Sequence, residues 1–167
     1  MRIRRLEPHE VALHRDIRLC ALRDAPEAFE ETAAQAEARP PSYWEELTRG
    51  VTEPGRHVMF LACVGDAVEG SIYGLRDAER TDTGRVGGTW VAPAHRRQGA
   101  GKALLQAVIS WAEGEGFRRV RLWAPAASTA ALALYRGAGF SATGRRRGLP
   151  KNVALEIVEL ECTLSGR

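Results

Sequence analysis

A strand that ends in a glycine-containing loop and leads into a long helix is the feature that most constrains the fold of this chain. The apolar strand over residues 86–92 stops at Pro93, which has no N–H group to donate to a sheet. After the loop, an amphipathic pattern continues over residues 101–115. Free N–H groups at the start of a helix bind anions, and Gly99 and Gly101 let a ligand approach the main chain closely. We therefore predict a phosphate-binding loop between this strand and this helix.

Two common phosphate-binding motifs do not fit the loop. A P-loop has the pattern Gly-x-x-x-x-Gly-Lys-Ser/Thr, but Arg96 stands at its first glycine and Ala103 at its hydroxyl position. A dinucleotide-binding fingerprint requires a third glycine where this chain has Leu104. The pattern that fits is Arg-x-x-Gly-x-Gly, in which Arg96 and the neighbouring Arg97 add positive charge suited to phosphate. The alternative is a connecting loop whose two arginines face the solvent.

The composition indicates one globular domain over residues 1–167. The chain has 167 residues, 44% of them hydrophobic, which is enough for a single core. Its three cysteines have no paired spacing, so we expect neither a disulfide framework nor a metal site. The net charge of +3 suits an anionic cofactor but does not indicate nucleic acid. No stretch resembles a signal peptide or a membrane span, so we expect a cytoplasmic protein without a membrane partner.

Apolar periodicity and turn signals predict an α/β chain with a mixed sheet. The expected elements are, in order, a strand at 3–6, helices at 9–23, 28–39 and 43–48, strands at 57–64, 67–75 and 86–92, a helix at 101–115, a strand at 119–124, a helix at 128–139, and strands at 141–147 and 153–164. The first helix should bury one face, formed by Leu13, Ile17, Cys20 and Ala21. Ser42 should cap the third helix, and Gly87 with Gly88 suggests a β-bulge or a close approach of the backbone.

A second motif lies at residues 128–140, with the sequence Ser-Thr-Ala-Ala-Leu-Ala-Leu-Tyr-Arg-Gly-Ala-Gly-Phe. It is similar to the Asn-x-x-Ala-x-x-Leu-Tyr-x-x-x-Gly-Phe motif of the GNAT N-acetyltransferase superfamily. The loop pattern Arg-x-x-Gly-x-Gly, preceded by Trp-Val-Ala-Pro, resembles the acyl-CoA-binding signature of the same family. The two motifs occur in the family's order, with a helix and a strand between them. Ser128 departs from the family's usual asparagine, so it either contacts the cofactor or serves only as a helix cap.

The resemblance implies a GNAT fold, an α/β domain with a mixed, mostly antiparallel central sheet and flanking helices. It also implies acetyl-CoA as co-substrate, with the loop amides holding the pyrophosphate of CoA. The residues that it assigns to cofactor binding are Trp90, Val91, Arg96, Arg97, Gln98, Gly99, Ala100, Gly101, Lys102 and Ser128. No metal is expected in the reaction.

Tyr135 is the residue to which the resemblance assigns catalysis. Its phenol would protonate the departing CoA sulfur, whereas the alternative is an aromatic residue of the core. The main-chain N–H of Val91 would polarise the thioester carbonyl. Many relatives carry a glutamate on the strand before the loop, but residues 86–90 contain none. The general base is therefore left open between a water chain and a carboxylate such as Glu30, Glu31 or Glu156.

Several charged residues have two interpretations each. The acidic cluster of Glu27, Glu30, Glu31 and Glu37 is either a solvated face or a wall that attracts a cationic amine. The run Arg145-Arg146-Arg147 either borders the substrate or forms a solvated strand face, and His95 is expected at the surface.

The sequence thus predicts an N-acetyltransferase that moves acetyl directly from acetyl-CoA to the primary amine of a small molecule. Neither motif contains a cysteine, so no covalent acyl-enzyme is indicated. The alternatives are a protein or peptide N-terminal acetyltransferase and a CoA-binding module without catalysis. The resemblance also allows a homodimer.

Overall fold

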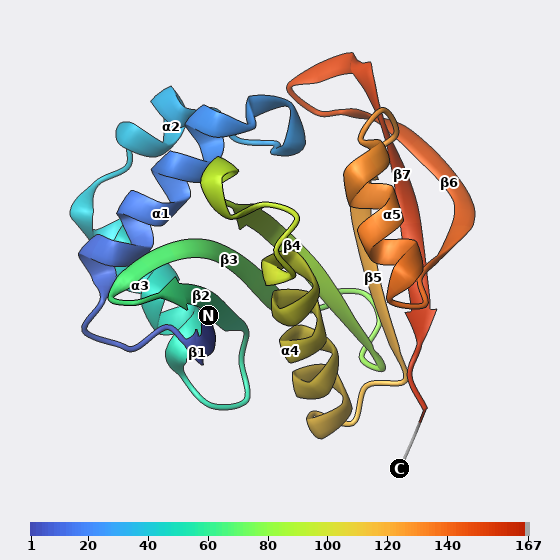
Figure 1. Cartoon of the computed structure of the whole chain (residues 1–167), viewed down its shortest axis with the longest axis horizontal. Helices are drawn as coiled ribbons and strands as arrows, with labels where there is room; N and C mark the ends of the chain where they lie inside the picture. The colour runs from blue at the N-terminus through green and yellow to red at the C-terminus, as the bar shows by residue number, and fades with distance from the viewer. Residues whose placement is uncertain (166–167) are drawn as a thin grey trace.

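The computed structural model describes residues 1–165, which form a mixed sheet flanked by helices (Figure 1). In the described residues the sheet has seven strands in the order β1-β2-β3-β4-β5-β7-β6. Only β4 and β5 are parallel, so the predicted mixed and mostly antiparallel α/β sheet is confirmed. The strands are β1 (Arg2–Arg5), β2 (Val58–Val64), β3 (Ala67–Arg76), β4 (Thr83–Val91), β5 (Arg119–Pro125), β6 (Ser141–Leu149) and β7 (Asn152–Thr163). The helices are α1 (Val11–Asp24), α2 (Ala33–Glu37), α3 (Pro41–Thr52), α4 (Ala100–Gly114) and α5 (Thr129–Gly137), with short 3₁₀ turns at Pro26–Ala28 and Pro93–His95.

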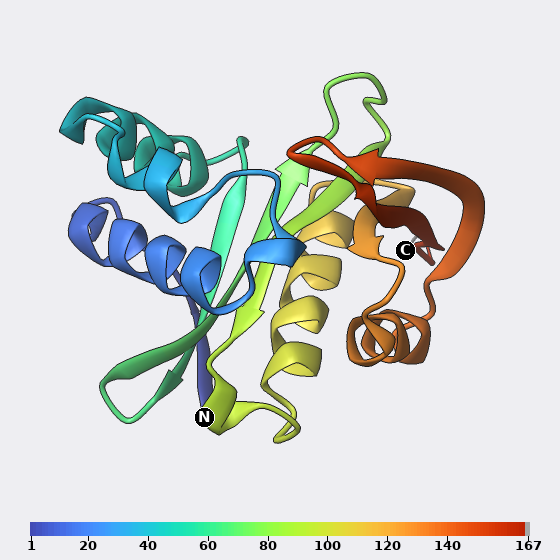
Figure 2. The same ribbon diagram turned by 90° about the horizontal axis from the view of Figure 1, so that it is seen from above.

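The helices cover both faces of the sheet (Figure 2). On one face α1, α2 and α3 bury a cluster that includes Leu22, Trp44 and Met59. On the other face α4 and α5 pack on a second cluster around Leu104, Leu105 and their neighbours. The buried residues of α4 lie on one stripe, so the amphipathic pattern predicted for this helix is confirmed.

The buried face of α1 differs from the prediction by a rotation of the helix. Cys20 is exposed, and the fully buried position is His14, which lies one turn from Ile17. A polar imidazole can occupy the core here because both of its nitrogens are hydrogen-bonded, to Thr48 Oγ1 at 2.9 Å and Tyr73 OH at 2.6 Å. The periodicity located the helix, but it could not identify a partnered histidine as a core residue.

The segment at 28–39 was predicted as one helix, and this prediction is wrong. A 3₁₀ turn ends at Ala28, Phe29 is extended and buried, and α2 starts only at Ala33. Thr32 begins α2 with a capping box to Gln35, which favours a new helix start over a continuous helix.

The predicted cap of the third helix is also wrong. Ser42 makes no cap hydrogen bond, and α3 begins at Pro41 with Pro40 as N-cap. Proline suits the first helical position because the N–H that it lacks would have no partner there. The helix also runs further than expected, to Thr52.

A β-bulge interrupts β4, as the glycine pair predicted. The register with β3 places Trp90 opposite Ser71 and Gly87 opposite Tyr73, so Gly88 and Thr89 share one position on β3. Gly88 has a φ of +57°, and a Cβ on it would lie 2.2 Å from the Tyr73 ring. Glycine is therefore required here for both backbone conformation and space.

The parallel pairing between β4 and β5 is short. It covers residues 83–85 of β4 and ends where Arg85 lies opposite Arg121. Beyond that point the two strands diverge, as Figure 1 shows. The sheet therefore opens into a V whose arms are the second half of β4 and the second half of β5.

Candidate active site in the cleft between β4 and β5

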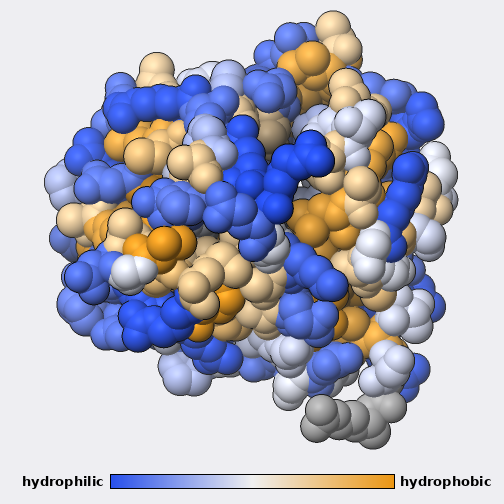
Figure 3. Space-filling model, viewed as in Figure 1, coloured by the Kyte–Doolittle hydropathy of each residue, from blue (hydrophilic) through white to orange (hydrophobic). Residues whose placement is uncertain are grey.

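A cleft of about 830 Å³ fills the opening between the diverging strands. In Figure 3 the surface is hollowed between the half that carries the N-terminal helices and the half that carries α5 and the last strands. Its walls come from β4 and the following loop, from β5, from α5 and from the segment before α2. The predicted site residues that line it are Trp90, Val91, Arg96, Arg97, Gly99, Gly101, Lys102, Ser128 and Tyr135.

The loop before α4 presents free main-chain donors to this cleft. Gly99 is the N-cap of α4 with a φ of +87°, which only glycine adopts without strain. The first hydrogen bond that closes the helix runs from Ala103 N to Gly99 O. The N–H groups of residues 97–102 have no acceptor within residues 1–165. An unpaired row of N–H groups at the positive end of a helix dipole is suited to binding a phosphate or pyrophosphate.

The two arginines of the loop have different surroundings. Arg96 is held by ion pairing with Asp24, and its Nε donates to Val91 O at 2.9 Å. Asp24 also accepts from Trp90 Nε1 at 2.9 Å, so it joins α1 to β4 and to the loop. Arg97 is exposed, with a φ of +60°, and forms no ion pair with any residue that the structure describes. Arg97 is therefore the loop arginine whose charge is available to an anion.

Two predicted cofactor-binding residues do not line the cleft. Gln98 turns its side chain back to donate from Nε2 to Ala94 O at 2.9 Å. The side chain of Ala100 is buried in the core as the first residue of α4. These residues can contribute to the site only through their main-chain N–H groups, which are among the unpaired N–H groups of residues 97–102.

Gly101 faces α5 across the cleft. A Cβ on Gly101 would lie 3.2 Å from Leu134 Cδ2 and 4.0 Å from Val91 Cγ2. Ser128 begins α5 and accepts a long capping hydrogen bond from Ala131 N at 3.4 Å. Its hydroxyl therefore serves as a cap and also lines the cleft, so both interpretations of Ser128 are compatible with its position.

Val91 turns its main-chain N–H toward the opening. Its neighbour Ala92 donates to Glu69 O on β3, and successive residues of a strand direct their N–H groups to opposite edges. The carbonyl of Val91 points the same way and is bonded by Arg96. At this height β5 no longer pairs with β4, so the Val91 N–H faces the cleft.

Tyr135 lies on α5 and extends its ring into the base of the cleft. The ring is 7% exposed and packs against Phe140 at a centroid distance of 6.0 Å. Burial raises the pKa of the Tyr135 phenol, and the Thr89 hydroxyl opposes this by a smaller amount. Tyr135 is therefore protonated at neutral pH and able to donate.

The end of the cleft away from the amide loop is lined by aromatic side chains and one carboxylate. Phe29 enters from the segment before α2 and Trp123 from β5. Glu27 is the acidic residue among those that line the cleft, and it forms no ion pair within the described residues. Sequence reasoning did not single out Phe29 or Trp123. The signal that could have found this wall is Trp123, a large aromatic residue two positions before the end of β5.

The β6–β7 hairpin closes over this end from the far side. Arg147 lies over the Trp123 ring, with Cζ 4.7 Å from the centroid, and its Nη2 donates to Glu30 Oε1 at 2.9 Å. Arg145 also lies over Trp123, at 5.9 Å. Neither arginine is among the residues that line the cleft, and Arg145 also pairs with Glu159 at 3.5 Å, so two of the three consecutive arginines pack on the outside of the Trp123 wall.

The carboxylates suggested as general bases are all engaged elsewhere. Glu30 pairs with Arg147, Glu31 with Arg18 and Arg39, and Glu156 with Arg146. None of the three lines the cleft. His95 lies beside Glu69, 3.9 Å away, and is outside the cleft as well. Glu27 is therefore the carboxylate that lines the cleft within the described residues.

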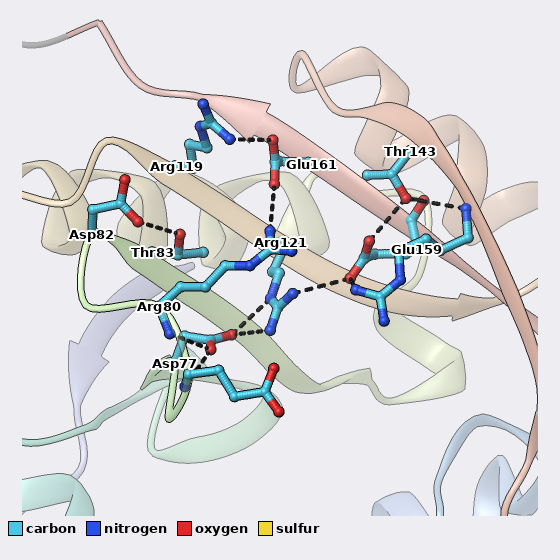
Figure 4. Close-up of polar contacts among 11 residues, drawn as sticks. Asp77, Arg80, Asp82, Thr83, Arg119, Arg121, Thr143, Glu159 and Glu161 are labelled. Carbon is cyan, nitrogen blue, oxygen red and sulfur yellow. Dashed lines mark hydrogen bonds and ion pairs between the residues drawn. The ribbon is translucent and has the colours of Figure 1, made fainter.

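A buried ionic cluster stabilises the closed end of the V (Figure 4). Arg121, on β5, binds Asp77 through Nε at 2.7 Å and Glu159 through Nη1 at 3.3 Å. Thr143 donates to Glu159 at 2.9 Å. Burial would raise the pKa of Asp77, but N–H donation by the loop and the Arg121 guanidinium together lower it below its usual range. The cluster ties the β3–β4 loop to β5 and β7 at the point where the strands begin to diverge.

Residues 1–165 contain neither a cluster of metal-ligating side chains nor a membrane-spanning helix. No three His, Cys, Asp or Glu side chains gather there as a set of metal ligands. No helix in that range has the length and apolarity needed to cross a membrane.

Comparisons with known proteins were made by sequence and by structure. Residues 19–140 match the model described as the Acetyltransferase (GNAT) family. N-acetyltransferase family 8 member 3 of Mus musculus is 46% identical over 54 residues, which are 32% of this chain and 24% of that protein. The aminoglycoside N(6')-acetyltransferase type 1 of Stenotrophomonas maltophilia is 30% identical over 108 residues, covering 60% of this chain and 70% of that protein. The match to the first curated relatives spans about a quarter of their length.

Solved structures share the whole fold. The structure of yncA, a putative acetyltransferase from Salmonella typhimurium with its cofactor acetyl-CoA, superposes with a TM-score of 0.76 at 19% identity. It covers 100% of this chain and 95% of that one. At this identity the likeness establishes the fold alone.

Proposed function

Because the chain belongs to the GNAT acetyltransferase family, we propose that it transfers the acetyl group of acetyl-CoA directly to the primary amine of a small molecule. The observation that carries the proposal is the cleft, which places a row of free N–H groups and a protonated phenol along the two arms of one opening. The unpaired N–H groups of residues 97–102 suit the pyrophosphate of CoA, and Arg97 and Lys102 add positive charge beside them.

The thioester would then lie deeper in the V, between Val91 and Tyr135. The Val91 N–H stabilises the oxygen of the thioester carbonyl as negative charge develops on it. The amine nitrogen attacks the carbonyl carbon, the new C–N bond forms and the C–S bond breaks. Tyr135 gives its proton to the departing sulfur, and the proton lost by the amine returns to the phenolate through water. The amine loses one proton and the sulfur gains one, so the reaction is balanced without a covalent enzyme intermediate.

The acceptor end favours an amine with an apolar body. Phe29 and Trp123 offer aromatic surface, and Glu27 offers one unpaired carboxylate to an ammonium group. Arg145 and Arg147 lie over the Trp123 ring of this wall, and their positive charge disfavours a polycationic acceptor.

Thiol release from acetyl-CoA tests the proposal. The acceptors are phenethylamine, an aminoglycoside, glycine and a short peptide with a free N-terminus. We expect phenethylamine to accelerate release most, and Tyr135→Phe to lower kcat by about 10²–10⁴-fold while the affinity for acetyl-CoA is retained. Activity with the peptide alone would identify an N-terminal acetyltransferase. Binding of acetyl-CoA without release to any acceptor would identify a CoA-binding module.

A further inference from the structure

The hydroxyl of Thr89 is a buried polar group without a partner. Among the described residues, buried side-chain atoms that lack a hydrogen bond are Thr89 Oγ1 and Trp44 Nε1. Leaving a buried hydroxyl unsatisfied costs about 1–3 kcal/mol, and a valine of the same shape would avoid that cost. A threonine at this position therefore requires an explanation.

The bulge in β4 decides which way Thr89 points. Val86, before the bulge, packs in the core under α4, and Trp90, after it, packs under α1. In a regular strand these two residues, an even number of positions apart, would share a face. The extra residue at Gly88 reverses the alternation, so Thr89 and Val91 turn toward α4 and α5. The bulge thereby moves the Thr89 hydroxyl into the cleft.

Tyr135 faces this hydroxyl from the other arm of the V. Both residues line the cleft, and Thr89 lies close enough to act on the ionisation of the phenol by hydrogen bonding. Thr89 Oγ1 has no hydrogen-bond partner within the described residues, so its proton is available to the phenolic oxygen.

We infer that Thr89 is a positioning residue for Tyr135, donating its hydroxyl proton to the phenolic oxygen. This inference rests on the proposed function, in which Tyr135 protonates the sulfur. The phenolic O–H is then directed at the sulfur, because its oxygen is held by Thr89. As the proton leaves, negative charge develops on the phenolic oxygen and the Thr89 O–H stabilises it. Thr89 keeps its own proton throughout, so the balance of the reaction is unchanged.

The test compares Thr89→Val, which removes only the donor, with Thr89→Ser, which keeps it. The first readout needs no acceptor: the ¹³Cζ chemical shift of Tyr135 in labelled protein with and without CoA, assigned through Tyr135→Phe. We expect the valine variant to move this resonance and the serine variant to leave it near its original position. A folded valine variant is expected, because it replaces an unsatisfied hydroxyl by a methyl group, and Thr89→Ala serves the same purpose if it does not fold.

The second readout is kinetic, with acetyl-CoA and phenethylamine. Thr89→Val should lower kcat roughly tenfold and leave the affinity for acetyl-CoA unchanged, while Thr89→Ser should restore most of the rate. The alkaline limb of the kcat profile should move to higher pH in Thr89→Val, because the phenol loses the donor that lowers its pKa. In the Tyr135→Phe background, Thr89→Val should have no further effect.

Three results would overturn the inference. An unchanged resonance in Thr89→Val would show that the hydroxyls do not interact. An unchanged kcat in Thr89→Val beside a reduced kcat in Tyr135→Phe would remove Thr89 and leave the proposed function intact. An equal loss on the Tyr135→Phe background would show that Thr89 acts on another group. An undiminished kcat in Tyr135→Phe would instead remove the proposed acid itself.

Discussion

The stability of this protein should fall between neutral pH and pH 5 because of one buried histidine. His14 is fully buried, with hydrogen bonds to Thr48 and Tyr73 and with Arg18 one turn away. Burial, with a smaller contribution from the Arg18 charge, lowers the pKa of His14 from 6.5 to about 4. His14 therefore takes up a proton near pH 6.5 in the unfolded chain, but only near pH 4 in the folded chain. Stability is complete above the unfolded pKa and is lost as pH falls toward the folded pKa.

The magnitude follows from these two pKa values. A tenfold difference in proton affinity is worth 1.36 kcal/mol, so the full effect of His14 is about 3 kcal/mol, of which about 2 kcal/mol is lost by pH 5. In a domain of this size that corresponds to a fall in Tm of about 4–8 °C. The lowered pKa values of Glu10 and Asp77 act below this window, because stability from such carboxylates is lost only near and below pH 4. Burial lowers the pKa of His57 as well, so His57 adds to the same slope.

Urea unfolding at pH 7.5, 6.5, 5.5 and 5.0 measures the effect in the wild type and in His14→Gln. The glutamine variant cannot take up the proton, so its free energy of unfolding should change much less across this range, whatever its value at pH 7.5. His9→Gln is the matched control, since that side chain is 77% exposed and should leave the slope as it is. A slope in His14→Gln as steep as in the wild type would refute the reasoning.

Three further predictions concern the site and its supports. Gly101→Val should weaken acetyl-CoA binding in calorimetry with little change in Tm, because the new side chain would press on Leu134 in the mouth of the cleft, and unchanged affinity would contradict the loop assignment. Gly88→Ala should destabilise the protein by about 2–5 kcal/mol, from the left-handed backbone and the overlap with Tyr73, whereas Gly114→Ala, with open space around its Cβ, should not. Arg121→Met should cost about 3–5 kcal/mol in urea unfolding because it leaves Asp77 buried without its cation and Glu159 with only the exposed Arg145. Arg119→Met, at a half-exposed ion pair, should cost less than about 1 kcal/mol, and equal losses would contradict a special role for the buried cluster.

Much of the fold could be predicted from short-range features of the sequence. Most of the strands and the long helix α4 were located from apolar periodicity, proline and glycine, because these act through backbone geometry within a few residues. The mixed sheet followed from the order of those elements. The errors fell where periodicity is weak, in the alanine- and glutamate-rich segment at 28–39, where a capping box and the buried Phe29 override helix propensity.

In the candidate site, too, one part could be predicted from the sequence and another part could not. The loop at 97–102 was predictable because a phosphate-binding helix start is built from consecutive residues, with glycine at the left-handed N-cap position of the helix. The pair Gly87 and Gly88 likewise predicted a bulge. The bulge turns Thr89 toward Tyr135 because of the register between β3 and β4. This register cannot be predicted from a local sequence pattern.

Contacts between distant segments were decided by the tertiary structure alone. Asp24 holds Arg96 from 72 positions away, and Glu30 meets Arg147 across 117 positions. The sequence offered both arginine groups as charges for a ligand, but the fold engages Arg96 and Arg147 in ion pairs and gives Arg97 no ion-pair partner among residues 1–165. Motifs determine which main-chain groups can bind an anion, since that geometry is local. Which charges remain available is set by the packing of elements far apart in the chain, because an ion pair depends on where each side chain is placed in space and not on its neighbours in sequence.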